Sequence, residues 1–166
     1  MVTIMNRTKI LFRRIRWLTG LFMLGLFLSG VTAIPLTGEV NGLAHWLGPA
    51  GGASVLAQWL GRVREALGQT QAAYPFLFYG TDWLAFAHLA IAVAFIGPYI
   101  DPVRNKWVIT FGLIACVGVI PLALIAGQVR GIPLPWRLID CSFGIVGSVP
   151  LLLCRRSIRT LERQRD

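Results

Sequence analysis

Four long apolar segments constrain the fold of this chain more than any other feature of its sequence. They cover residues 17–36, 78–100, 107–126 and 134–154. A helix needs about 20 apolar residues to cross a hydrocarbon layer about 30 Å thick, and it satisfies its own backbone hydrogen bonds there. We therefore predict an all-α membrane protein, a single domain over residues 1–166 whose four transmembrane helices form an antiparallel bundle.

Charged residues are few, and the basic ones are distributed unevenly. Only 14% of the 166 residues are charged, against about 25% in ordinary globular domains, so most of the surface must face something other than water. Twelve of the 16 Lys and Arg residues fall on one side of the four-span arrangement, in the arm 1–16, the connection 104–106 and the tail 155–166. By the positive-inside rule we expect a multi-pass protein with both termini in the cytoplasm. The other four are Arg62, Arg64, Arg130 and Arg137.

The same distribution accounts for the net charge of +9 without a nucleic acid. The sequence has no basic groove with interleaved aromatics and no nucleic-acid-binding motif, so we predict no nucleic-acid partner. The basic ends suit anionic lipid headgroups, and the lipid bilayer is the first partner that the sequence implies. The charge asymmetry and the lack of organelle signals favour a bacterial inner membrane.

The basic arm 1–16 has two rival interpretations. Its apolar residues 10–12 lie next to Arg13 and Arg14, which is typical of a helix that lies at the inner headgroups and then turns into the membrane. Alternatively, the basic segment, the apolar run and the ending 31–33 (Val-Thr-Ala) match a secretory signal with a cleavage site. Cleavage would leave three spans in the same orientation.

The segment 37–75 is the longest loop and lies outside in this topology. Ser54 can cap a helix that we expect to run to Leu67 and to end at Gly68. One side of this helix is apolar and the other polar, so we predict an amphipathic helix in the outer interface. A docking face for a partner is an alternative. The apolar side consists of Val55, Leu56, Trp59, Leu60, Val63 and Leu67.

Prolines and small residues shape the spans. Asp101-Pro102 begins a short inner turn, so the second and third spans should be antiparallel neighbours. Pro121 should kink the outer third of the third span. Small residues four apart allow close helix contact, and the first, third and fourth spans contain such pairs. They are Gly25 with Ser29, Gly112 with Cys116, and Gly144 with Ser148.

Four ionisable residues lie inside otherwise apolar spans: Asp82, His88, Arg137 and Asp140. At about 1.5 Å per residue, all four fall in the outer half of the bundle. An ionisable group at membrane depth is costly and is a functional-site hypothesis by default. Arg137 and Asp140 are three residues apart, so they share a helix face and can pair. Asp82 and His88 lie about 240° apart around their helix, so they point to different neighbours.

Three interpretations of these residues are open. In the structural one, a buried Asp82 or Asp140 is neutralised by Arg137 or Arg130 and holds the second and fourth spans together. In the second, the residues form a pocket that binds a lipid headgroup, a quinone or a proton from the outside. In the third, another subunit completes the site. The second interpretation makes the outer loop a lid, whose contacts would be His45, Trp46 and Trp59.

Histidines and cysteines do not form a recognisable cofactor site. A zinc site needs about three protein ligands, and His45 and His88 are the only histidines, so we predict no metal and identify no cofactor. We interpret His88 as a neutral imidazole bonded to a carbonyl or hydroxyl, with a single axial contact to a haem or pigment as the alternative. Three cysteines lack the spacing of a redox pair and are interpreted as packing residues. They are Cys116, Cys141 and Cys154.

No known catalytic motif occurs in the chain. It contains no HExxH, GxSxG or P-loop. The cysteine spacing excludes the disulfide-generating four-helix membrane enzymes, and the first span lacks the acidic residue of the small four-helix drug exporters. We therefore expect a non-enzymatic accessory or assembly subunit of a membrane complex, whose partners are other membrane subunits or copies of itself. The alternative is a small membrane enzyme or a lipid- or quinone-binding protein with a polar site in the outer half of the bundle.

Overall fold

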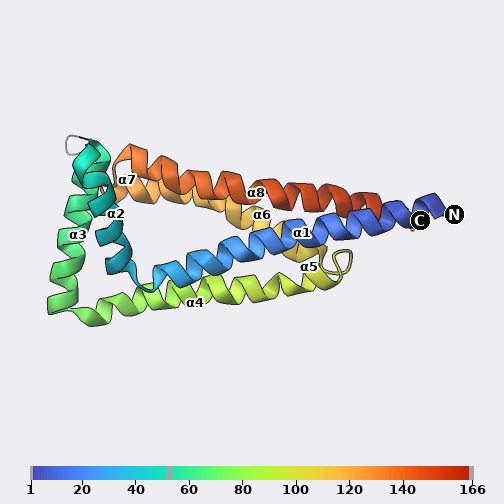
Figure 1. The fold of residues 1–166 in the computed structure, drawn as a ribbon, viewed down its shortest axis with the longest axis horizontal. Coiled ribbons are helices and arrows are strands. Elements are labelled where there is room, and N and C mark those ends of the chain that lie inside the picture. The colour runs from blue at the N-terminus through green and yellow to red at the C-terminus, as the bar shows by residue number, and fades with distance from the viewer. Residues whose placement is uncertain (1, 52–53, 165–166) are drawn as a thin grey trace.

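The computed structural model describes residues 2–51 and 54–164, and these ranges are helical apart from short connections. Four long apolar helices pack together, with further helices between the first and second of them (Figure 1). The predicted all-α membrane fold is confirmed. The segments long and apolar enough to cross a membrane are Thr8–Ala33, Pro75–Ile100, Lys106–Val129 and Leu134–Glu162.

Helix α1 (Val2–Ala33) is longer than the predicted first span. The basic arm continues the helix without a break, so the expected turn between the arm and the span does not exist. No Pro or Gly precedes Gly20 in the sequence, and the long side chains of this segment favour a helix. Ile15 and Thr19 are fully buried, so cleavage after Ala33 would remove part of the core.

Two helices, α2 (Leu36–Gly51) and α3 (Val55–Ala73), form a hairpin where only one helix was expected. Ser54 caps α3 as predicted, because its hydroxyl accepts a hydrogen bond from the Ala57 N–H at 3.1 Å. The predicted end at Gly68 is wrong. The helix continues to Ala73 because the Gln and Ala residues that follow are good helix formers and offset the one glycine.

The second long segment is composed of three helical pieces. A 3₁₀ turn, η1 (Pro75–Phe78), leads into α4 (Tyr79–Ala94), and α5 (Ile96–Ile100) follows. The helix is interrupted at Phe95 because Pro98 has no N–H to donate to the carbonyl four residues before it.

The turn after α5 is closed by side-chain hydrogen bonds. The Asp101 carboxylate accepts from the Arg104 N–H at 3.1 Å. The Asn105 amide donates to the carbonyls of Asp101 and Gly97, at 2.9 and 3.2 Å. The short connection predicted between the second and third spans is therefore well fixed.

Helix α6 (Lys106–Pro121) passes into a π-helical turn, η2 (Leu122–Ala126), and ends in α7 (Gly127–Val129). The change comes directly after Pro121, whose ring and missing N–H disrupt an α-helical ladder. The sequence predicts a kink at this proline, and the structure accommodates it by a change of helix type. Gly131, at φ 69°, then turns the chain toward α8 (Leu134–Glu162).

The four long helices form two pairs. Helix α4 packs mainly against α1 and α6 mainly against α8, while α1 also contacts α8 and joins the pairs. The pairs meet where both termini lie, which we call the terminal end, and diverge toward the α2–α3 hairpin, which we call the hairpin end (Figure 1). The second and third spans are therefore joined by a short turn but pack along different partners, contrary to the prediction.

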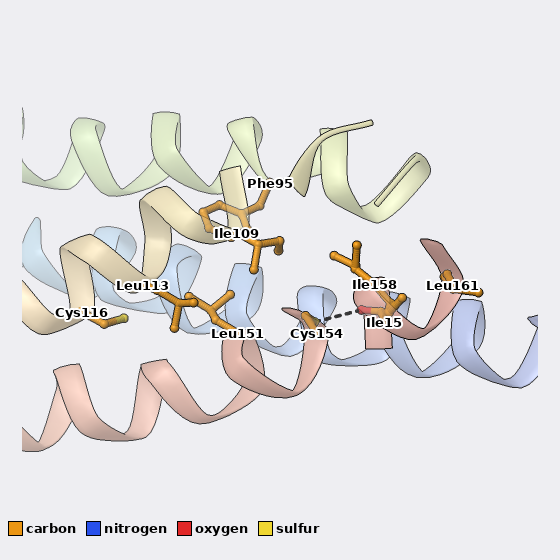
Figure 2. Close-up of a cluster of buried hydrophobic side chains, with 9 residues drawn as sticks. All are labelled: Ile15, Phe95, Ile109, Leu113, Cys116, Leu151, Cys154, Ile158 and Leu161. Carbon is orange, nitrogen blue, oxygen red and sulfur yellow. Dashed lines mark hydrogen bonds between the residues drawn. The ribbon is translucent and has the colours of Figure 1, made fainter. Parts of the chain in front are cut away.

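The buried core lies in the half of the bundle next to the terminal end (Figure 2). Phe95 is fully buried there, and its ring centroid lies 4.7 Å from that of Phe22. The Cys154 thiol, 3.7 Å from the Ile15 carbonyl oxygen, ties α8 to α1. The core residues are Ile15, Phe95, Ile109, Leu113, Cys116, Leu151, Cys154, Ile158 and Leu161.

Small residues allow close approach within each pair. A Cβ added to Gly30 would lie 2.9 Å from the Ala85 carbonyl oxygen, between α1 and α4. A Cβ on Gly144 would overlap the Cys116 carbonyl, between α8 and α6. The predicted small faces on α6 and α8 are thus close contacts. The predicted face on α1 is not, because Gly25 has no atom within 4 Å of its added Cβ.

Candidate functional site

Asp82 lies on the exposed side of α4 near the hairpin end. Among residues 2–51 and 54–164, no side chain or backbone group forms a hydrogen bond or an ion pair with its carboxylate. Asp82 lines a shallow, mostly apolar groove together with Tyr79, Trp83 and Phe86. Asp82 is therefore presented to the surroundings of the bundle and not to its interior.

The three rings of this groove form an aromatic ladder, a name we keep for Tyr79, Trp83 and Phe86. Tyr79 and Trp83 meet edge to face at 6.0 Å and 82°, and Trp83 and Phe86 meet at 5.8 Å and 88°. Edge-to-face contacts of this kind are favourable, so the rings hold one another in place. Each of these residues is more than half exposed, Tyr79 by 62%, Trp83 by 56% and Phe86 by 60%.

The depth of Asp82 follows from its place in the span. It is seven residues from Pro75, the first of 26 residues in this segment. At about 1.5 Å per residue the segment is about 39 Å long, about 9 Å longer than the hydrocarbon layer. When the segment is centred in the hydrocarbon layer, Asp82 lies about 6 Å inside the boundary of that layer.

His88 is turned toward α1 and bonds to its own helix. Its Nδ1 lies 2.8 Å from the Leu84 carbonyl oxygen, and because a carbonyl only accepts, Nδ1 carries the proton. Its Cβ would lie 3.2 Å from a Cβ on Gly30, so the residue belongs to the crossing of α1 and α4. This geometry matches the interpretation of His88 as a carbonyl-bonded imidazole.

Arg137 bonds to the π-helical turn. Its Nη1 donates to the Leu124 carbonyl oxygen at 3.1 Å, and Gly127 makes room for its side chain, since an added Cβ would lie 2.7 Å from Arg137 Cδ. Its Nε is buried without an acceptor in the part of the chain that the structure describes. The guanidinium therefore supports the backbone where Pro121 has disrupted the regular helix.

Asp140 does not form the expected pair with Arg137. The residue is half-buried in α8, and within the described ranges Lys106–Glu162, at 2.7 Å, is the ion pair that forms. The two residues share a helix face, but the guanidinium is directed to η2. Asp140 thus has no polar partner among the described residues.

The four ionisable residues are not brought into one site. Asp82 and His88 lie on α4, in one helix pair, and Arg137 and Asp140 lie on α8, in the other. No ion pair links Asp82 or Asp140 to Arg130 or Arg137 in the described part of the chain. The electrostatic link between the second and fourth spans, which the structural interpretation predicts, is therefore missing, because the two spans belong to different pairs.

The three residues predicted as lid contacts lie on the hairpin at one end of the bundle (Figure 1). His45 and Trp46 of α2 are exposed, Trp46 by 73%. Trp59 of α3 is half-buried, and the Arg62 guanidinium lies over its ring at 5.4 Å. The groove around Asp82 lies beside this hairpin on α4, so a lid role stays a prediction.

The residues of the aromatic ladder were not predicted from the sequence as part of a site. Their signal is present, because aromatics recur four and then three residues apart around Asp82. Among the described residues, no group of three or more His, Cys, Asp or Glu is placed to hold a metal ion. Comparison with protein-family models, curated proteins and solved structures finds no match for the chain.

Proposed function

We propose that this four-span membrane protein is an accessory or assembly subunit of a membrane complex, and that its partner docks on α4 around Asp82. The observation that carries the proposal is an exposed, unpaired carboxylate on a helix apolar enough to span a membrane. An ionisable group that faces hydrocarbon is costly. A partner that presents a polar or charged group to Asp82 would remove that cost.

The position of Asp82 argues against a role at the membrane surface alone. Tyr79 and Trp83 suit the aromatic belt at a membrane interface. Asp82, about 6 Å inside the boundary, has one methylene between its backbone and its carboxyl group. It therefore cannot extend to the headgroups as Lys and Arg do.

We further propose that the terminal end lies in the cytoplasm. Basic residues gather at this end from α1, the turn before α6 and the last part of α8. Of those that the structure describes, Lys106 alone forms an ion pair. Unpaired cations beside a span are retained on the cytoplasmic side and contact anionic headgroups. In this orientation the groove around Asp82 faces the outer leaflet.

Site-specific photocrosslinking in the membrane of origin tests the docking face. Benzoylphenylalanine replaces Phe86 in the groove or, as a matched control, Phe143, which is 69% exposed on α8. We expect a discrete protein adduct from position 86, weakened by Asp82→Asn, and none from position 143. Lipid adducts alone at position 86, or equal protein adducts from both positions, would contradict the proposal.

A ligand site in the outer half of the bundle is the second candidate, and Asp140 supports it. A half-buried carboxylate without a polar partner in the described chain could bind a lipid headgroup or a quinone. Native mass spectrometry of gently extracted protein distinguishes the candidates. A bound small molecule that is lost in Asp140→Asn supports the ligand site. A bound partner chain without a small molecule supports the assembly subunit, and a bare monomer contradicts both.

A further inference from the structure

We infer that the partner element on this face is a transmembrane helix that carries an Arg or Lys at the level of Asp82. The inference rests on the proposed function and names the chemistry of the partner. The cation would lie between the Asp82 carboxylate and the rings of the aromatic ladder. Three features of α4 lead to this partner: the charge, the rings and the small residues further along the same side.

The negative charge of Asp82 is best complemented by a cation. No Lys or Arg of the described chain lies within ion-pair distance of its carboxylate. At the edge of a hydrocarbon layer the attraction between opposite charges is stronger than in water, and a hydrogen bond from a charged donor is stronger than one from a neutral donor. An Arg or Lys therefore complements Asp82 better than a Ser, Asn or Gln.

The aromatic ladder adds a second preference for a cation. A guanidinium or ammonium group is attracted to a ring face within about 6 Å, most strongly to Trp. Two such contacts occur elsewhere among the described residues: Arg16 lies 5.8 Å from the centre of the Tyr99 ring, and Arg62 lies 5.4 Å from that of Trp59. Around Trp83 the rings are exposed and no cation is present within the described ranges.

The small residues beyond the ladder indicate that the cation belongs to a helix. Ala87, Ala90 and Ala94 are exposed on α4 and lie within the same arc of about 140° as the ladder and Asp82. Ala90 and Ala94 have the four-residue spacing that allows two helix backbones to approach closely. A lipid headgroup would fill the groove and leave this alanine face unused, whereas a helix would cover both.

A second copy of this chain is not a suitable partner, because its arginines are not available to Asp82. Arg137 is bonded to Leu124 and Arg62 lies over Trp59. Arg64 and Arg130 lie outside the segments that can span a membrane. Another copy would therefore present no free arginine at the depth of Asp82 on the hairpin side, and we assign the helix to a different chain.

The test uses a synthetic helix as a defined probe. The probe is a Leu-Ala helix of about 24 residues with one Arg about six residues from one end, and its matched control has Gln at that position. Each carries a donor dye at that end, and the full-length protein carries an acceptor on Gln71→Cys, at the exposed end of α3. Energy transfer is titrated in phosphatidylcholine vesicles.

We expect the Arg probe to associate with the protein about tenfold more tightly than the Gln probe, as one desolvated cation contact predicts. Asp82→Asn should abolish the difference, and Trp83→Leu should reduce it. Glu39→Gln, which alters an exposed carboxylate outside the spans, should leave it unchanged. Unfolding curves of the variants establish that each has folded.

Equal association of the two probes with the folded protein would overturn the inference. So would energy transfer between two labelled copies of the protein that depends on Asp82, because it would make a second copy the partner. Neither result bears on whether position 86 crosslinks to a protein in its own membrane. The two experiments therefore distinguish an error in the inferred cationic helix from an error in the proposed docking face.

Discussion

Gly144 of α8 packs directly against the backbone carbonyl of Cys116 in α6, with no side chain between the two helices. Gly147 continues the contact, since its added Cβ would lie 3.1 Å from Cys116 Sγ and 3.4 Å from the Phe22 ring. The first contact joins the α6–α8 pair, and the second brings α1 onto it. One short stretch of α8 thus contacts both α6 and α1.

Gly144→Ala should destabilise the protein. The added methyl would overlap a backbone carbonyl that cannot rotate away, and overpacking of this kind costs about 1–3 kcal/mol. Reversible unfolding in mixed micelles of dodecylmaltoside and increasing dodecylsulfate measures the change. Gly25→Ala, where nothing lies within 4 Å, should leave the protein as stable or stabilise it by up to about 1 kcal/mol, because Ala favours a helix more than Gly does. Equal effects of the two substitutions would show that the crossing is elsewhere.

Phe95→Ala should cost more than any substitution on the lipid-facing surface. Phe95 is fully buried and contacts Phe22, and Gly112 is small enough to admit its ring. Truncating a buried Phe costs about 3–5 kcal/mol through lost packing and the cavity left behind. Phe143→Ala, at a residue that is 69% exposed, should leave the free energy of unfolding in the same titration nearly unchanged. A small decrease in the free energy of unfolding for Phe95→Ala would mean that the core is not formed around Phe95.

Much of the fold could be predicted from the sequence because bilayer thickness determines how long an apolar helix must be. The four spans, the Ser54 cap and the close contacts at Gly112 and Gly144 all follow from local rules. The pairing of the spans does not. In lipid a buried face and an exposed face are both apolar, so hydropathy cannot show that α4 packs on α1 while α6 packs on α8.

The candidate site was harder to predict because it depends on that pairing. Asp82 and Asp140 were both predicted to lie in the outer half of the bundle, but they belong to different helix pairs. Arg137 was expected to bond to Asp140, and its guanidinium instead bonds to Leu124. That partner exists only because a π-helical turn forms after Pro121, and a helix type of this kind has no sequence signature of its own.

Arg137→Gln should loosen the hairpin end of α6. The substitution removes the bond to the Leu124 carbonyl and the packing of the side chain over Gly127. Loss of one hydrogen bond from a charged donor costs about 1.5–3 kcal/mol. Hydrogen exchange followed by mass spectrometry should show faster exchange of amides 122–129 with little change in α1. Arg130→Gln, at an exposed neighbour, is the control, and equal acceleration by both would contradict a specific role for Arg137.

Helix α1 should be retained in the mature protein. Its residues Ile15 and Thr19 are fully buried, and Thr19 Oγ1 lies 3.6 Å from Cys154 Sγ. Removal of residues 1–33 would expose the core side of α8, so the shortened chain should not fold stably. Intact-mass measurement of protein purified from its membrane should give the full-length chain. A mass lacking these 33 residues would establish that the segment is a cleaved signal.

The buried cysteines make the orientation of the bundle directly measurable. Cys116, Cys141 and Cys154 are all buried and unpaired, so the folded protein should react with a membrane-impermeant maleimide only after denaturation. On this silent background, Gln69→Cys in the hairpin should be labelled in intact spheroplasts, because the unpaired cations at the terminal end favour the cytoplasm for that end. Arg163→Cys in α8's C-terminal flank should be labelled only after the membrane is permeabilised. The reverse pattern would place the groove around Asp82 in the inner leaflet and would require a partner with its cation on that side.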